Sequence, residues 1–194
     1  MKRGAITLSL LFFATSLFGQ TEAGPTEKGN MILGGSLSFS RASGDLYQGV
    51  TEIQLSPFGG FFLKKNIALG AELKWTTASM ENFSSSFIAL GPWAAYMFAK
   101  SKSSQKVEGT LIPFAKVGFL FRRLGSSGDG WDESASGFMI PIGGGLLYMM
   151  SPTLGLLVDA YFSIDRSKNK GADEAFSGNR IVVSVGLSYI RGKS

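Results

Sequence analysis

Apolar residues alternate with small or polar residues along most of this chain, with the period of two that is typical of β-strands. In the segment from Leu154 to Ile164 every second residue is apolar, and most residues between them are small or polar. Strict alternation of this kind describes a sheet whose two faces meet different surroundings. The same pattern predicts three more strands, at Met31–Phe39, Ile67–Trp75 and Ile181–Tyr189.

Four further segments alternate less clearly and are predicted as strands as well. They are Thr51–Phe62, Ser86–Phe98, Glu108–Arg122 and Phe138–Met149. In the second and fourth of these both faces are apolar, so the direction in which each residue points stays open. These segments contain four prolines: Pro57, Pro92, Pro113 and Pro141. A proline has no backbone N–H to donate, so we expect a β-bulge or a position near the membrane boundary at each of them. No segment has a helical period, so the sequence predicts an all-β fold with eight strands.

The few charged residues in these segments all lie on the face opposite the stronger apolar stripe. They are Glu52, Glu72, Lys74, Glu108, Lys116, Arg122 and Asp159. A soluble sandwich or barrel would need many charged residues on its outer face, yet charged residues make up only 17% of the chain. If the apolar face meets lipid instead, every backbone N–H and C=O group must pair within the sheet. A sheet can meet this requirement only if its first and last strands pair, so that it closes into a barrel. We therefore predict an eight-stranded antiparallel up-and-down transmembrane β-barrel.

The first twenty residues have the composition of a secretory signal peptide. Lys2 and Arg3 precede an apolar stretch, Ala5–Phe18, which is shorter than the roughly 20 residues of a membrane anchor helix. The predicted organisation is a signal peptide at 1–20, a short periplasmic segment at 21–28, the barrel at 29–190 and a C-terminal tail at 191–194. Long predicted connections on one side and shorter ones on the other are typical of the bacterial outer membrane.

Composition excludes several functions. The chain has no His and no Cys, which excludes a His base, a Cys nucleophile and a His/Cys metal site, and no paired carboxylates stand on one strand face. We therefore expect no enzymatic activity and no cofactor. Without Lys2 and Arg3, the 19 basic residues fall to 17 against 14 acidic ones, too small and scattered an excess for a nucleic-acid interface.

Several segments resemble the outer-membrane-protein β-barrel domain family, which comprises small eight-stranded barrels similar to OmpX and OmpW. They are Lys28–Phe39, Phe61–Gly70, Gly91-Pro92-Trp93 and Val183–Tyr189. The resemblance covers nearly the whole mature chain and implies a monomer in outer-membrane lipid, delivered by the outer-membrane assembly machinery. Such barrels usually end on an aromatic residue that this machinery recognises, whereas here Tyr189 is followed by five more residues.

Inside an eight-stranded barrel, side chains nearly fill the lumen. The charged residues predicted to form a network there are Glu52, Glu72, Lys74, Lys116 and Asp159. One hypothesis makes this network structural, and the other makes it a narrow polar conduit. Apolar residues of the two ambiguous strands either line part of the lumen, as would suit the hydrophobic solutes that OmpW-like barrels are thought to pass, or reflect a reversed strand phase. These residues are Ile88, Leu90, Tyr96, Met139, Leu147 and Met149.

Basic residues near the predicted outer loops are candidates for contacts with lipopolysaccharide phosphates. They are Arg122, Arg123, Arg166 and Arg180. Acidic residues in the same loops, such as Asp132 and Glu133, favour a mixed solvated surface instead. The sequence thus predicts a non-enzymatic outer-membrane barrel with a structural or surface-interaction role and a largely filled lumen. The alternative is a small porin-like channel for polar or hydrophobic solutes.

Overall fold

The computed structural model describes residues 24–43, 51–80, 83–99, 107–128, 131–169 and 175–192. The predicted signal peptide at 1–20 lies outside these residues, as does the end of the predicted tail, 193–194. Within the described part of the chain, no helix is long and apolar enough to cross a membrane.

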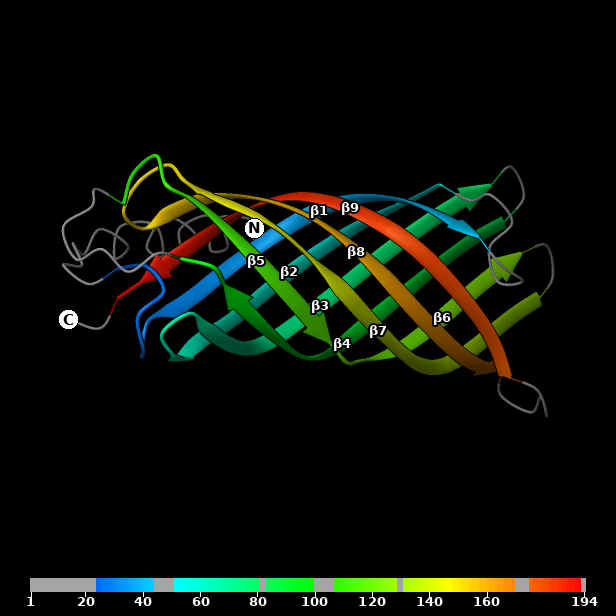
Figure 1. Cartoon of the computed structure of the whole chain (residues 1–194). Coiled ribbons are helices and arrows are strands. Elements are labelled where there is room, and N and C mark those ends of the chain that lie inside the picture. Colours follow the sequence, from blue (N-terminus) through cyan, green and yellow to red (C-terminus); the bar gives the residue numbers. More distant parts are fainter. Residues whose placement is uncertain are drawn as a thin grey trace, which may run out of the picture.

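The strands form one antiparallel sheet that closes on itself (Figure 1). They are β1 (Met31–Ser43), β2 (Thr51–Lys64), β3 (Ile67–Met80), β4 (Phe83–Met97), β5 (Leu111–Gly118), β6 (Leu120–Gly128), β7 (Trp131–Met149), β8 (Leu154–Asn169) and β9 (Ala175–Arg191). Closure comes from the pairing of the first strand with the last, in which Met31 lies opposite Arg191. We call the end of the barrel that holds this pair the termini end, and the opposite end the loop end. The predicted all-β closed barrel is confirmed.

β5 and β6 are two halves of one wall strand, so the barrel has eight such strands. β4 and β7 each pair with both halves, and both ladders are interrupted around Phe119. Pro92 on β4 and Pro141 on β7 flank the interruption from its two sides. A proline has no N–H to donate, so both neighbours lose a ladder bond at the same level. The Phe119 N–H still donates to the Pro92 carbonyl oxygen at 3.0 Å.

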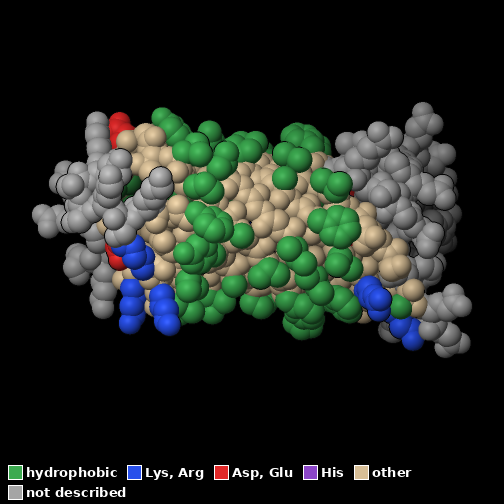
Figure 2. Space-filling model, viewed as in Figure 1, with side chains coloured by type: hydrophobic (Ala, Val, Ile, Leu, Met, Phe, Trp, Pro, Cys, Tyr) green, Lys and Arg blue, Asp and Glu red, His purple; other side chains and the backbone are tan. Residues whose placement is uncertain are grey.

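Alternate residues of each strand face outward to a continuous apolar surface or inward to the lumen. On β8, Val158 and Phe162 are exposed outward, whereas Asp159 and Ser163, each the next residue along the strand, are buried. Figure 2 shows the resulting apolar surface as green side chains around the middle of the barrel. We call this outward apolar surface the lipid belt. Its presence makes the barrel a transmembrane one, because such a surface is stable only against hydrocarbon.

The strands continue past the lipid belt at the loop end, further than the sequence predicts. β7 begins at Trp131 rather than Phe138, and β8 ends at Asn169 rather than Ile164. The predicted outer connections were therefore too long. The physical reason is that water replaces lipid outside this part of the wall. Outward residues there are no longer apolar, and the alternation in the sequence disappears although the ladder continues.

Candidate functional site

The termini end of the lumen begins with a short polar segment, residues 24–30, which we call the N-terminal cap. Thr26 Oγ1 donates to Asn66 Oδ1 at 2.7 Å, and the Asn66 N–H donates to the Thr26 carbonyl oxygen at 2.9 Å. Asn30 Nδ2 donates to the Gly24 carbonyl oxygen at 2.9 Å. Thr26 and Asn30 are both buried. The two bonds between Thr26 and Asn66 hold the cap against the turn between β2 and β3. The bond from Asn30 to Gly24 lies within the cap itself.

Above the cap, the termini half of the lumen is filled by apolar side chains. We call this group the apolar plug. It consists of Ile32, Phe62, Ala68, Trp93, Ala95, Met97, Ile112, Phe114, Leu147, Met149, Leu157 and Ile190. Phe58 packs against the plug, with its ring edge-on to Trp93 at 6.1 Å between centroids. Apart from the indole N–H of Trp93, which can only donate a hydrogen bond, a layer of this composition offers no strongly polar side-chain group to replace the hydration shell of a passing ion.

The plug also determines the phase of the two ambiguous strands. Met139, Leu147 and Met149 are fully buried inside the barrel. The other three residues expected with them face the lipid belt instead: Ile88, Leu90 and Tyr96 are 54%, 56% and 45% exposed. Of the two hypotheses for these six residues, lumen lining is therefore correct for the three on β7 and reversed phase for the three on β4. The inward residues of that strand include the small Ala89 and Ala95 and the large Trp93.

The middle of the lumen holds four of the five residues predicted as a charge network, which we call the inner charge cluster. Lys116 Nζ lies 2.9 Å from Glu72 Oε2, and Lys74 Nζ lies 3.4 Å from Glu72 Oε1. Lys74 Nζ also lies 3.9 Å from the centroid of the Tyr161 ring. Asp159 accepts a hydrogen bond from Ser184 Oγ and lines the same cavities as Lys116. The cluster contains two cations and two anions.

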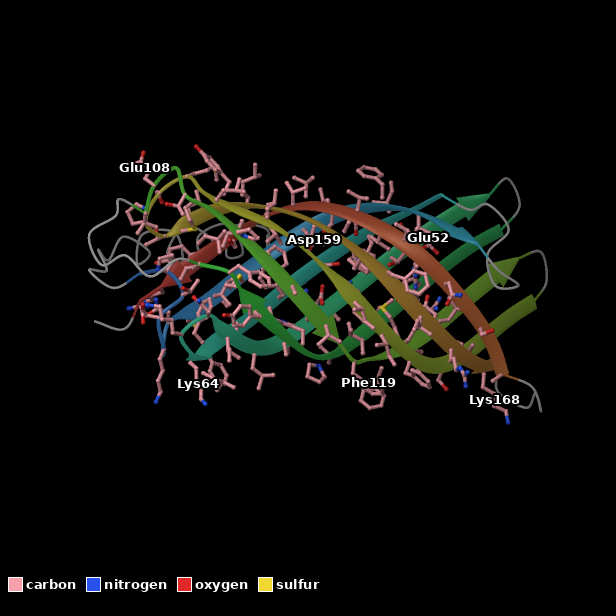
Figure 3. All side chains as sticks on the ribbon, in the orientation of Figure 1. Glu52, Lys64, Glu108, Phe119, Asp159 and Lys168 are labelled. Carbon is pink, nitrogen blue, oxygen red and sulfur yellow. The ribbon has the colours of Figure 1, made fainter. Side chains whose placement is uncertain are left out.

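The fifth predicted residue, Glu52, belongs to a second group nearer the loop end, the arginine cluster. Arg180 Nη1 donates to Glu52 Oε2 at 2.7 Å, and Arg180 Nη2 donates to Asp165 Oδ2 at 2.6 Å. Arg122 Nη1 reaches the same Asp165 oxygen at 3.2 Å. Both guanidinium groups lie over the Phe87 ring, 4.2 Å and 4.6 Å from its centroid. This cluster too contains two cations and two anions (Figure 3, where Glu52 and Asp159 are labelled).

The structure corrects the predicted position of two arginines. Arg122 and Arg180 were expected near the outer loops as anion contacts, but their side chains lie inside the barrel, 3% and 1% exposed. For Arg180 the reason is the strand extension described above, because this residue precedes the predicted start of its strand. Arg122 is the last residue of a predicted strand and lies on the inward face that the alternation assigns to it. Arg123 and Arg166 do lie on the outside, as exposed side chains of β6 and β8.

A polar group beside the inner charge cluster was not predicted. Gln54 Nε2 donates to the Tyr161 hydroxyl at 2.8 Å and to Ser56 Oγ at 2.7 Å, and Thr76 Oγ1 donates to Gln54 Oε1 at 3.3 Å. Tyr161 in turn lies under Lys74 of the inner charge cluster. Asp165 was missed as well, although it continues the inward phase of Asp159 along β8. That phase is the signal that would have found it.

Two small cavities lie beside the inner charge cluster. One is lined by Glu72, Lys74 and Tyr161 among others and has a volume of about 10 Å³. Another lies between Lys116 and the apolar plug and has a volume of about 20 Å³. Each has room for on the order of one water molecule. Among the described residues, no group of three or more acidic side chains is arranged to hold a metal ion.

Comparison with known proteins supports the fold. Neisserial surface protein A is 12% identical with a TM-score of 0.68, over 84% of this chain and 99% of that one. OprG from Pseudomonas aeruginosa is 10% identical with a TM-score of 0.55, over 90% and 100%. Ail, the attachment invasion locus protein of Yersinia pestis, in complex with the heparin analogue sucrose octasulfate, is 16% identical with a TM-score of 0.51, over 84% and 99%. No protein-family model and no curated protein sequence matches.

The resemblance to small outer-membrane barrels is therefore confirmed as a likeness of fold. A closed antiparallel barrel with an outward apolar belt is the architecture of bacterial outer-membrane proteins. The lipid belt and the closed sheet together assign this chain to the bacterial outer membrane, as the sequence predicts.

Proposed function

We propose that this protein is a non-enzymatic outer-membrane barrel with a structural or surface-interaction role, and that its lumen is closed to solute flow. The observation that carries the proposal is the succession of layers across the lumen. Along the barrel, a solute would meet the N-terminal cap, the apolar plug, the inner charge cluster and the arginine cluster. Each layer contains side chains that contact one another, which supports a lumen without a continuous path for solutes.

The pairing within the two charge clusters favours the structural hypothesis over the conduit. A conducting path needs charged groups that exchange partners with a passing ion. Here Glu72 lies between two lysines, and Asp165 between two arginines. Desolvated charges are stable only when they are paired and hydrogen-bonded, and breaking one pair is costly. The clusters would thus hold together strands that face one another across the lumen.

Conductance across a planar lipid bilayer tests the closed lumen. The full chain, folded in detergent and inserted from either side, is expected to give no steady single-channel steps. A variant with the plug opened by Met97→Gly and Met149→Gly, after its folding is checked by gel mobility without boiling, is expected to conduct more than the wild type. Steady steps from the wild-type protein would establish the small-channel alternative.

The surface-interaction role is supported by the wall that continues beyond the lipid belt. Barrels of similar fold include one solved in complex with the heparin analogue sucrose octasulfate, so a barrel of this architecture can bind a ligand. We further propose that the protein is a monomer once the assembly machinery has inserted it, because a closed sheet leaves no edge strand to pair with a second copy.

A further inference from the structure

Three basic side chains point outward at the loop end, and we call them the basic patch: Arg123 of β6, with Arg166 and Lys168 of β8. Strand pairing sets Arg123 opposite Ser136, and Ser136 opposite Lys168, so these two cations stand in one row across three strands. Arg166 lies two residues along β8 on the same face. From the usual strand spacing and rise, the three Cα atoms lie within roughly 12 Å of one another.

An aromatic cluster adjoins the basic patch on its membrane side. The Phe119 ring packs edge-on against Phe121, with centroids 5.4 Å apart, and stacks on Phe138 at 5.7 Å. Phe121 is 68% exposed and pairs with Phe138, which pairs in turn with Arg166. Figure 3 shows Phe119 and Lys168 pointing away from the barrel wall on the same side. Apolar and basic groups therefore follow one another directly along this surface.

Among the side chains that the structure describes, no carboxylate neutralises the basic patch on the outer surface of the wall. Of the carboxylates that the structure describes near the loop end, Glu52 and Asp165 are buried inside the barrel and paired with arginines there. Among the described residues, no carboxylate forms an ion pair with any member of the patch. The three described side chains of the patch thus present positive charge sideways, at the edge of the lipid belt (Figure 2).

We propose that the basic patch binds the phosphate groups of a phosphorylated glycolipid in the outer leaflet, with the acyl chains of that lipid lying against the aromatic cluster. Arginine guanidinium groups bind phosphate oxygens in bidentate fashion, and lysine adds a point charge. A lipid neighbour meets both surfaces at once because it lies beside the wall, whereas a soluble polyanion has no acyl chain to cover the phenylalanines. The inference rests on the proposed function, since it requires insertion in an outer membrane.

The test compares two variants of the full chain that lose the same charge at opposite ends of the barrel. The first neutralises the basic patch by Arg123→Gln, Arg166→Gln and Lys168→Gln. The matched control neutralises three exposed cations at the termini end by Lys28→Gln, Lys64→Gln and Arg191→Gln. Each protein, folded in zwitterionic detergent, is titrated calorimetrically with bisphosphorylated lipid A and with the same lipid after its phosphates are removed. Gel mobility without boiling confirms that both variants are folded.

The patch variant is expected to bind bisphosphorylated lipid A about tenfold more weakly than the wild type, which corresponds to about 1.4 kcal/mol. The control variant is expected to match the wild type, and removal of the phosphates is expected to abolish the difference. Equal losses in both variants, or no loss in either, would overturn the proposal. It would also be overturned if heparin, but not lipid A, bound through the patch. Failure of the proposed function is recognised separately, as conductance by the wild-type protein.

Discussion

Arg180 donates two hydrogen bonds to one oxygen of Asp165, from Nη2 at 2.6 Å and from Nε at 2.9 Å. The same oxygen lies 3.2 Å from Arg122 Nη1, and Ser163 Oγ donates to the other carboxylate oxygen at 2.7 Å. One buried carboxylate therefore joins β6, β8 and β9 across the lumen. This arrangement makes Asp165 the residue whose removal should disturb the arginine cluster most.

Asp165→Asn is expected to lower the free energy of unfolding by about 3 kcal/mol or more, because it leaves two buried guanidinium groups with Glu52 as their remaining carboxylate in the cluster. Urea unfolding of the protein in lipid vesicles measures the change. The double variant Asp165→Asn with Arg122→Met removes one of the uncompensated cations and should recover part of the loss. An unfolding midpoint equal to that of the wild type would contradict a structural role for this carboxylate.

Lys116→Met is expected to reduce the resistance of the barrel to heat, because Glu72 then keeps only Lys74, at 3.4 Å. The effect should be smaller than that of Asp165→Asn, since the Lys116 side chain is 20% exposed and water can replace part of its interaction. The temperature at which unboiled protein loses its compact gel mobility measures the change. Lys116→Arg keeps the charge and should retain most of the resistance. Unchanged heat resistance of Lys116→Met would count against a structural network.

Two adjacent leucines of β7 allow a matched test of the apolar plug. Leu147 is fully buried in the plug, whereas Leu146 is 43% exposed in the lipid belt. Leu147→Ala is expected to cost about 3 kcal/mol, because it leaves a cavity that the rigid barrel cannot close. Leu146→Ala should cost clearly less, since lipid chains fill the vacated space. Equal losses in urea unfolding would show that the plug is no better packed than the lipid-facing surface.

Gly70 is expected to tolerate no side chain. A Cβ atom there would lie 2.6 Å from Cζ2 of Trp93 and would overlap the carbonyl oxygen of Gly59. Gly70→Ala should therefore prevent closure or destabilise the barrel severely, seen as loss of the compact form on an unboiled gel. Gly125, where an added Cβ meets nothing within 4 Å, is the control, and Gly125→Ala should fold normally. A normally folded Gly70→Ala would mean that Trp93 and the β2 backbone shift easily.

The sequence predicts the architecture well where the two faces of a strand meet different surroundings. Along β8, lipid outside and polar groups inside produce the alternation around Asp159 that identifies the strand and its phase. On β4 and β7 the inner face meets the apolar plug, so Trp93 and Leu147 face inward while Ile88 faces lipid. Both faces of these strands are then apolar, and alternation alone cannot distinguish them.

The candidate site is predicted only in part, for a related reason. Glu72, Lys74, Lys116 and Asp159 lie at the level of the lipid belt, where an inward charge stands out against apolar neighbours. Partners from different strands are set by register, which no local pattern contains. The assignment of Glu52 to Arg180, which is 128 residues away along the chain, therefore requires the closed sheet.

The wall of β6 and β7 beyond the lipid belt also limits how anything approaches this protein. Residues 131–137 precede the belt on β7, and at the usual rise and tilt such a stretch spans roughly 15 Å along the barrel axis. β7 pairs with β6 along this whole stretch, and from Ala135 onward it pairs with β8 as well. Among the described residues, this stretch therefore forms a stiff rim between the lipid surface and the outer end of the barrel. A protease acting from outside the cell would find this stretch of backbone already engaged in a ladder.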